Sequence, residues 1–366
     1  MIDDSYTNFL SYDEFYSHCY NVYMSSLKKL SVLILSFIFV APTASAHEAY
    51  VLPYDTFWNA VTGPISSRAL DALSNSNNLR VTILIVISVW ILLALNFYAR
   101  KTVLGQKIHS SLERFAKYGS HFVRITIGTA FIFSAISGTF LGPELHGSLF
   151  PYPYLLQLFL LASGIMIAIG FLTELAALIS LVIYIWSITV YGTYVFTYLN
   201  YFGELLVLLL FGMRNFSFDR YVFGPLTRFK RFKKYEIVIV RVCYGLAIIF
   251  AAITVKLLHP EITTEVVTTW HLNQFHWLFP SDPLLIAFGA GVVETVMGLF
   301  IIFGFEMRLT VLVSLFYITL SLLYFRELVW PHLLLYGISF SLLVQPEVFT
   351  LDDLFFRKKK NSRIRK

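Results

Sequence analysis

Charged residues are scarce in this chain of 366 residues. They make up 14% of it, whereas hydrophobic residues make up 57%. Soluble domains carry about 25% charged residues, and one soluble core cannot hide so much apolar surface. We therefore expect an integral membrane protein, with the lipid bilayer as its main partner.

Cysteines and familiar active-site motifs are also nearly absent. The two cysteines are Cys19 and Cys243, and Cys19 precedes an expected cleavable signal. A mature chain with one cysteine excludes an internal disulfide, a CxxC redox pair and a thiolate zinc site. The sequence has no P-loop, GxGxxG or GxSxG motif, and no histidine pair within spans suited to haem. No motif therefore assigns a reaction.

The segment 24–46 has the pattern of a signal peptide. Lys28 and Lys29 precede an apolar run at 30–40, and Ala44-Ser45-Ala46 forms a cleavage site. An uncleaved anchor is the alternative, but the run has about half of the ~20 residues needed to span a bilayer. We expect the mature chain to begin at His47. Residues 1–23 fit no signal and are interpreted as a doubtful N-terminal extension.

Long apolar runs predict an all-α membrane protein with nine transmembrane helices after the signal. Very short turns at 173–174 and 306–308 predict tight helical hairpins. The expected spans are 81–99, 119–141, 155–172, 175–193, 195–213, 237–258, 284–304, 309–325 and 328–345.

Basic residues fall on one side of these spans. Lys and Arg gather in the loops 100–118 and 214–236 and in the tail 355–366, whereas the opposite loops carry few. The positive-inside rule then places the N-terminus outside and the C-terminus in the cytoplasm of an inner (plasma) membrane protein. Because this asymmetry explains the positive net charge, we expect no nucleic-acid partner.

Two parts of the chain are similar to one another. "RITIGTAFIFSAI" at 124–136 matches "RVCYGLAIIFAAI" at 241–253 in seven of thirteen positions. "GIMIAIGFLTELAAL" then matches "GLFIIFGFEMRLTVL", and "NFSFD" matches "VFTLD". Three matches in the same order predict a duplicated four-helix unit. Since four is even, the two copies form a parallel repeat about an axis along the membrane normal.

These matches set the expected domain boundaries. The first segment (residues 119–222) and the second segment (residues 237–354) are the two four-helix repeats. Residues 47–79 form an outer segment too small for a domain, residues 80–118 hold the first transmembrane helix with its loop, and residues 355–366 are a basic cytoplasmic tail. Arg124 and Arg241 begin helices at the basic end, where we expect them to snorkel or contact lipid phosphate.

Both segments resemble the DoxX-like family of four-helix membrane proteins. The resemblance is carried by Arg-x3-Gly-x4-Phe in the first helix, Gly-x5-Gly-Phe in the second, and the final "SFD" or "TLD". It implies a membrane component, tied in some members to quinone-linked oxidation of sulfur compounds or to redox defence. A quinone and a periplasmic or membrane redox partner are expected on this ground alone. The first segment departs from the second, because "SAISGTFLGPE" has no lysine at the position of Lys256.

A few ionisable residues lie within the spans. Burial at bilayer depth costs about 2.5–3.5 kcal/mol on insertion scales, so Glu204 and Glu294 must face the bundle, a cation or water. They either form a proton-relay or cation site, or are protonated carboxyls bonded to a neighbouring helix. Lys256 either snorkels to the interface or pairs with Glu294. We predict that Glu294, Lys256 and His332 line one cavity open to the outside, and that the first segment is structural.

Histidines are concentrated on the expected outer face. His47, His271 and His276 are candidate metal ligands there, because imidazole is a common ligand. The alternative is that they are interfacial residues in a belt of Trp and Tyr.

Three functions remain at this stage. The first is an accessory or quinone-side membrane subunit of an oxidoreductase system, with its site between the two segments. The second is a proton-coupled small-molecule transporter, since parallel repeats with buried carboxyls suit alternating access. The third is a non-catalytic membrane scaffold for an exported partner.

Overall fold

The computed structural model describes residues 52–66, 68–212, 217–223, 230–274, 280–345 and 348–354. Contacts divide the chain into residues 1–44 and 45–366, and every described residue belongs to the second part. The expected signal peptide, the residues before it, His47, His276 and the basic tail lie outside the described residues.

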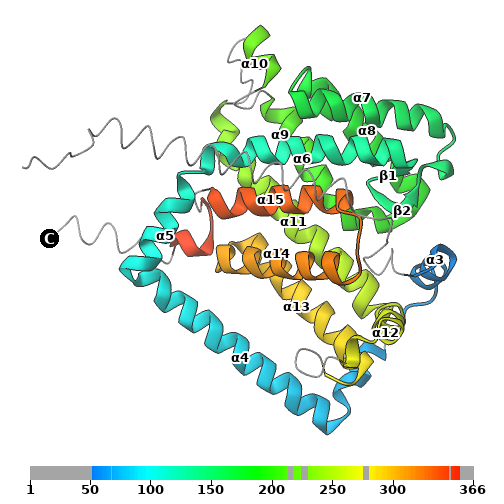
Figure 1. Cartoon of the computed structure of the whole chain (residues 1–366), viewed down its shortest axis with the longest axis vertical. Helices are drawn as coiled ribbons and strands as arrows, with labels where there is room; N and C mark the ends of the chain where they lie inside the picture. Colours follow the sequence, from blue (N-terminus) through cyan, green and yellow to red (C-terminus); the bar gives the residue numbers. More distant parts are fainter. Residues whose placement is uncertain are drawn as a thin grey trace, which may run out of the picture. The chain divides into compact units, whose positions relative to one another are not determined.

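Helices dominate the described residues, which confirms the expected all-α class (Figure 1). One feature was not expected, a short antiparallel hairpin of β1 (Thr139–Phe140) and β2 (Gly142–His146). The helices are α3 (Tyr54–Val61), η1 (Arg68–Leu73), α4 (Ser76–Lys101), α5 (Val103–Glu113), α6 (Ala116–Ser137), η2 (Gly147–Leu149), α7 (Pro153–Ile169), α8 (Thr173–Tyr191), η3 (Gly192–Tyr198), α9 (Leu199–Phe211), α10 (Phe218–Phe223), η4 (Lys230–Tyr235), α11 (Glu236–Ala251), η5 (Ala252–Leu257), α12 (Pro260–Thr269), η6 (Leu272–Gln274), α13 (Pro283–Phe303), α14 (Met307–Tyr324), η7 (Trp330–His332) and α15 (Leu333–Val344).

Among the described residues, six helical runs are long and apolar enough to cross a membrane. They are Ser76–Lys101, Ala116–Ser137, Thr173–Phe211, Phe232–Leu257, Pro283–Phe303 and Met307–Tyr324, and Pro153–Ile169 and Trp330–Val344 are shorter apolar helices. A helix covers most of every expected span. The count of nine stays a prediction, because α7, α9 and α15 have only 17, 13 and 12 residues.

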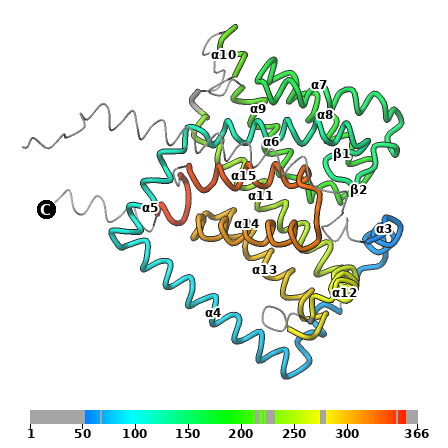
Figure 2. Tube along the Cα trace, viewed as in Figure 1, coloured from blue at the N-terminus to red at the C-terminus, as the bar shows by residue number. Residues whose placement is uncertain are grey.

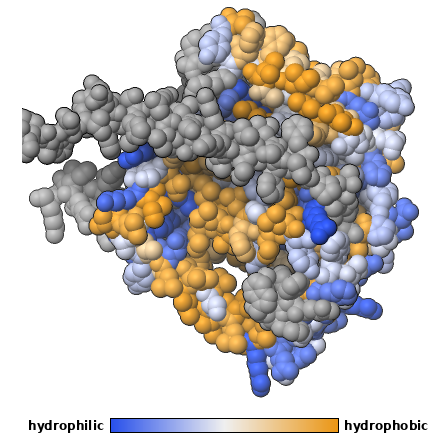
Figure 3. Space-filling model, viewed as in Figure 1, coloured by the Kyte–Doolittle hydropathy of each residue, from blue (hydrophilic) through white to orange (hydrophobic). Residues whose placement is uncertain are grey.

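The first of these helices, α4, is exposed along most of its length. None of its most apolar 18-residue window is buried, whereas 56% of the corresponding window of α6 is buried. Figure 3 shows the resulting apolar surface along α4. Its two ends are held by polar contacts: the Asn78 amide donates to Asp282 over 2.6 Å, and Arg100 pairs with Asp352 over 2.7 Å. Lipid is the natural environment of the middle of this helix.

Close glycine contacts join the first two long helices of each segment. A methyl group added at Gly128 in α6 would lie 2.7 Å from the carbonyl oxygen of Gly164 in α7. One added at Gly245 in α11 would lie 2.6 Å from the carbonyl oxygen of Gly298 in α13. Small residues let helix backbones approach closely in membranes, so both pairs set the spacing of their helices.

The α7–α8 turn of the first segment is tied to the end of that segment. Gly170 ends α7 with φ 74°. The Asp219 carboxylate accepts from the backbone N–H groups of Leu172 and Thr173 over 2.7 and 3.0 Å, and the Asp219 N–H donates to the Gly170 carbonyl over 2.8 Å. The carboxylate therefore satisfies the first N–H groups of α8.

The α13–α14 turn of the second segment repeats this geometry. Gly304 ends α13 with φ 63°. The Asp352 carboxylate accepts from the N–H groups of Glu306 and Met307 over 2.9 and 3.2 Å, and its N–H donates to the Gly304 carbonyl over 3.2 Å. Short connections at 170–172 and 304–306 thus form the tight hairpins that the sequence predicts.

The two arginines that begin the matched motifs are buried, which corrects the expectation that they snorkel. Arg124 and Arg241 are 1% and 3% exposed. Each packs against the glycine of its own turn, Gly170 or Gly304. Arg241 also donates to the Phe349 carbonyl over 2.8 Å. These arginines brace the turns, because a buried guanidinium needs acceptors that lipid tails lack.

The last long helix of each segment packs against the first long helix of the other. α9, near the end of the first segment, packs against α11, which begins the second, and α15 packs against α6 (Figure 2). Within the segments, α6 packs against α7 and α11 against α13. The interface between the segments is therefore formed by equivalent helices from each side.

Candidate functional site

A π-helical turn positions the lysine that distinguishes the two segments. α11 continues into η5, whose wider turns include a bond from the Leu258 N–H to the Ile253 carbonyl over 2.9 Å. Such turns are rare and often occur at functional sites. Lys256 lies on this turn and is only 5% exposed. The sequence gives no direct signal for a π-helix, although its lysine within an apolar run marks the place.

Lys256 pairs with Glu294 of α13. The distance from Lys256 Nζ to Glu294 Oε2 is 3.1 Å, and the side chains are 7% and 31% exposed. Gly291 allows this approach, because a methyl group there would lie 2.6 Å from Leu257 and 3.1 Å from the Lys256 Cβ. Of the two interpretations of Lys256, the structure therefore favours pairing over snorkelling. The pair places a proton donor beside an acceptor in an apolar helical layer.

His332 has a different carboxylate partner. Its Nε2 lies 2.8 Å from Glu327 Oε2, and its Nδ1 lies 3.1 Å from the Leu328 carbonyl oxygen. The Ser321 hydroxyl donates to the other Glu327 oxygen. Because Nδ1 faces a carbonyl oxygen, Nδ1 is the donor of that contact. A cavity shared by His332 with the Lys256–Glu294 pair stays a prediction. Sequence analysis missed Glu327.

Glu204 lies at the interface between the two segments. It is fully buried on α9 and lines a pocket of about 10 Å³ together with Ser120 of α6 and Glu236 of α11. A cleft of about 230 Å³ shares Ser120 and Glu236 and is also lined by Lys233 and Lys234. The carboxyl that the sequence places at mid-span is thus adjacent to the basic end of the bundle.

The histidines of the outer loops stay untested as metal ligands. His271 is exposed, with φ 54°, and the other two candidates lie outside the described residues. Within the ranges that the structure describes, no group of three or more His, Cys, Asp and Glu residues is arranged to hold a metal.

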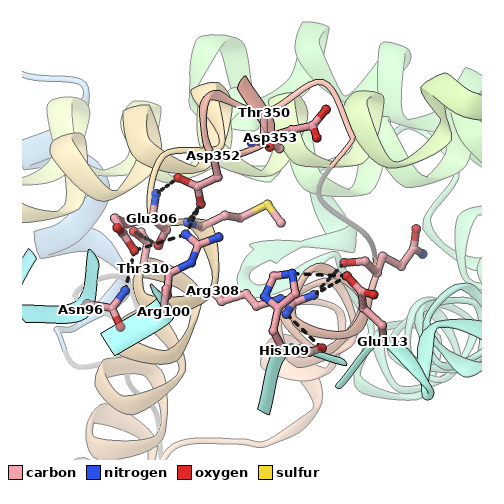
Figure 4. Close-up of polar contacts among 12 residues, drawn as sticks. Asn96, Arg100, His109, Glu113, Glu306, Arg308, Thr310, Thr350, Asp352 and Asp353 are labelled. Atoms are coloured by element: carbon pink, nitrogen blue, oxygen red, sulfur yellow. Dashed lines mark hydrogen bonds and ion pairs between the residues drawn. The ribbon is translucent and has the colours of Figure 1, made fainter. Parts of the chain in front are cut away.

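A polar cluster joins α4 to the second segment (Figure 4). Arg100 Nη1 lies 2.7 Å from Asp352 Oδ2 and 3.4 Å from Glu306 Oε2, and the Asn96 amide donates to Glu306. Burial raises the pKa of the Glu306 carboxyl, an effect that Arg100 opposes. The sequence motif "TLD" indicated Asp352. It did not predict that Asp352 binds both Arg100 of α4 and the backbone of the α13–α14 turn.

The next helix, α5, is joined to the same segment. Arg308 donates to the Gln345 and His109 carbonyls over 3.4 and 3.3 Å and pairs with Glu113 over 3.5 Å. Burial, assisted by the Arg308 charge, lowers the pKa of His109 to about 4. These contacts attach α5 to α14 and α15, and we assign the cluster an anchoring role.

The first segment carries a buried carboxylate at its opposite end. Glu144 of β2 is 4% exposed and accepts from the hydroxyl groups of Tyr194, over 3.2 Å, and Tyr198. The helix α3 adds an aromatic cover, with Phe57 and Trp58 packed edge-on against Tyr194. Sequence analysis missed this cluster, because Glu144 follows a Pro in what reads as an exposed loop.

The comparisons with known proteins identify one domain. Residues 237–327 match the family model described as DoxX. No curated protein and no solved structure matches the chain. The matched residues contain the π-helical turn, Lys256 and Glu294. Together with the apolar helices, this match shows that the chain is a multi-pass membrane protein with a DoxX-family domain at residues 237–327.

Proposed function

We propose that the chain is a quinone-side membrane subunit of an oxidoreductase system. The observation that carries this proposal is the Lys256–Glu294 pair, 3.1 Å apart on a π-helical turn of the DoxX domain. The equivalent positions of the first segment hold Thr139 and Leu160. Both charges are therefore present in one segment and missing from the other, as expected for a site rather than for a shared element of the fold.

The chemistry of the pair suits a quinone headgroup. A quinone, when bound, accepts two electrons from a partner oxidoreductase and two protons. The Lys256 ammonium can donate a hydrogen bond to a carbonyl oxygen. The Glu294 carboxyl, which is 31% exposed, can hold and release a proton beside it. The surrounding apolar helices strengthen such interactions by lowering the local dielectric.

The proposal includes an architecture that the matched turns support. We infer nine membrane spans after a cleaved signal peptide, with the C-terminus in the cytoplasm and two parallel four-helix repeats at 119–222 and 237–354. Three similarities favour duplication. Both segments have the same glycine contact and the same Asp cap, and the last long helix of each, α9 or α15, packs against the first long helix of the other. Reporter fusions after Lys366 test the orientation, and activity of an export-dependent reporter there would overturn it.

The decisive experiment measures bound quinone. The protein is extracted from its membrane in mild detergent, and quinone is quantified per protein by chromatography with mass detection. We expect bound quinone in the wild type and its loss in Lys256→Met and Glu294→Gln. Lys101→Met is the matched control, since that lysine is exposed at the end of α4. Equal quinone content in all four proteins would overturn the proposal.

A proton-coupled transporter is the second candidate. The cleft between the two segments favours it, because Glu204 lies at the inner end beside residues from α6, α11 and α15. Reconstituted vesicles separate the two functions: proton-driven uptake of a small molecule without bound quinone would favour the transporter. A scaffold for an exported partner predicts neither activity.

A further inference from the structure

We propose that Glu204 is a proton-binding residue that water reaches from the basic end of the bundle, through the cleft between α6 and α11. The inference goes beyond the proposed quinone site, because Glu204 lies on α9 of the first segment, whereas Lys256 and Glu294 belong to the second. It depends on the geometry of the interface between the segments and holds for either candidate function.

The route begins at the cleft of about 230 Å³. Lys233 and Lys234 line its entrance and are exposed. Ala116, at the N-terminus of α6, and Val348, which follows α15, also line it. An opening of this volume holds several water molecules, since one water occupies about 30 Å³ in the liquid.

A chain of polar side chains follows at the inner end of the cleft. The Ser120 hydroxyl donates to Glu236 Oε1 over 2.8 Å. The Gln345 amide donates to Ser120 over 3.3 Å and to the Ser341 hydroxyl over 2.9 Å. These groups come from α6, α11 and α15, so the polar chain crosses the interface between the two segments. Hydroxyl groups are both donors and acceptors and can pass a proton onward.

The last step is a pocket next to Glu204. Its volume of about 10 Å³ corresponds to about one water-sized probe, the size at which a polar site can hold a single water. Ser120, Glu236 and Gln345 line both this pocket and the larger cleft, so the two adjoin at these side chains. The apolar residues of the wall are Val123 of α6 and Ile237 and Val240 of α11, and Ser341 of α15 completes it.

The charged groups around Glu204 agree with this role. Glu236 is the titratable group of α11 in the pocket wall, and Lys233 and Lys234 of η4 lie farther out. The wall residues from α15 and α6 are uncharged. On the other side, Gly203 packs against Cys243, where a methyl group would lie 2.9 Å from the Cys243 sulfur.

Infrared difference spectroscopy of the full chain in lipid tests the route. A protonated carboxyl gives a carbonyl band that shifts in heavy water. We expect a band that responds to pH, disappears in Glu204→Gln, shifts in Glu204→Asp and exchanges rapidly with solvent deuterium. Ser120→Leu places an apolar side chain where the cleft and the pocket adjoin. It should slow this exchange about tenfold, because the loss of one hydrogen bond raises the barrier by about 1.4 kcal/mol.

Ser137→Leu is the matched control, because Ser137 is exposed at the other end of α6, and it should exchange like the wild type. The absence of a pH-responsive band dependent on Glu204, or exchange that Ser120→Leu and Ser137→Leu leave equally fast, would overturn the route. The measurement needs no quinone, so its failure is distinct from failure of the quinone proposal.

Discussion

The two segments have similar structures at one end and different structures at the other. At the basic end, each has a buried arginine, a glycine in a left-handed turn and an aspartate that caps the following helix. At the opposite end, the first segment forms a β-hairpin around Glu144, whereas the second forms a π-helical turn with Lys256. The shared end therefore holds the fold together, and the variable end is where chemistry can diverge.

At this end, the two segments also differ in the charged residues that they carry and in how those residues are buried. "FSAISGTFLGPE" of the first segment and "FAAITVKLLHPE" of the second match without a gap and place Glu144 opposite Glu261. Glu144 is buried among tyrosines, whereas the Glu261 side chain is 50% exposed and faces His259 at 3.4 Å. The position of Lys256 and the surroundings of the aligned carboxylate therefore differ together between the two segments. Variants that exchange residues between the segments can test this comparison.

Loss of the glycine contacts should have the largest effect, and an equal one in both segments. Gly128→Leu and Gly245→Leu each push a side chain into the backbone of the neighbouring helix. We expect each to destabilise the protein by about 3 kcal/mol, the upper range for overpacking. Thermal unfolding in detergent measures it. Gly289→Leu is the control, since nothing lies within 4 Å of that position. A large effect in one segment only would break the equivalence.

The aspartate caps should matter next, and unequally. Asn in place of Asp219 or Asp352 replaces one of the two oxygens that accept from backbone N–H groups by an amide NH2, at a cost of about 1–3 kcal/mol. Asp352→Asn should cost more, because it also removes the negative charge that pairs with Arg100 over 2.7 Å. Thermal unfolding of both variants, with Arg100→Gln and the Arg100→Gln/Asp352→Asn double variant, tests this. Additive effects in the double variant would contradict the coupling.

Exchange of the charged pair separates stability from function. Lys256→Thr leaves Glu294 beside an apolar turn and should destabilise the protein by about 1 kcal/mol, less than a fully buried pair because Glu294 is partly exposed. Adding Glu294→Leu installs both first-segment residues and should restore stability but not quinone binding. Unfolding temperature and bound quinone are measured on the same samples. A double variant that retains quinone would remove the pair from the proposed site.

The sequence predicts the Lys256–Glu294 pair better than it predicts the polar contacts elsewhere in the second segment. Lys256 and Glu294 are visible because ionisable residues are conspicuous in apolar spans, although helix direction places Lys256 towards the outer half and Glu294 near mid-depth. The hairpins are predicted by the very short turns between long apolar runs at 173–174 and 306–308. Glu327, the partner of His332, was missed because it follows the end of α14 and reads as a loop residue. The burial of Arg124 and Arg241 was missed too, because it depends on backbone acceptors that only the folded turns provide.

The smallest expected effect concerns α5, which contacts the second segment through Arg308. The first segment has Glu174 at the equivalent position, packed against Gly212. The contact with α5 is therefore a further difference between the two segments.

The pKa of His109 is lowered from 6.5 to about 4 by burial and by Arg308. The unfolded chain therefore binds more protons than the folded protein between these values, and stability should fall as pH decreases from 6.5 to about 4. His109→Gln should reduce this slope by a small amount, because the side chain is 33% exposed. Unfolding temperatures of the wild type and the variant across this window decide the matter. Parallel slopes would mean that α5 does not bury His109 against the second segment enough to lower its pKa.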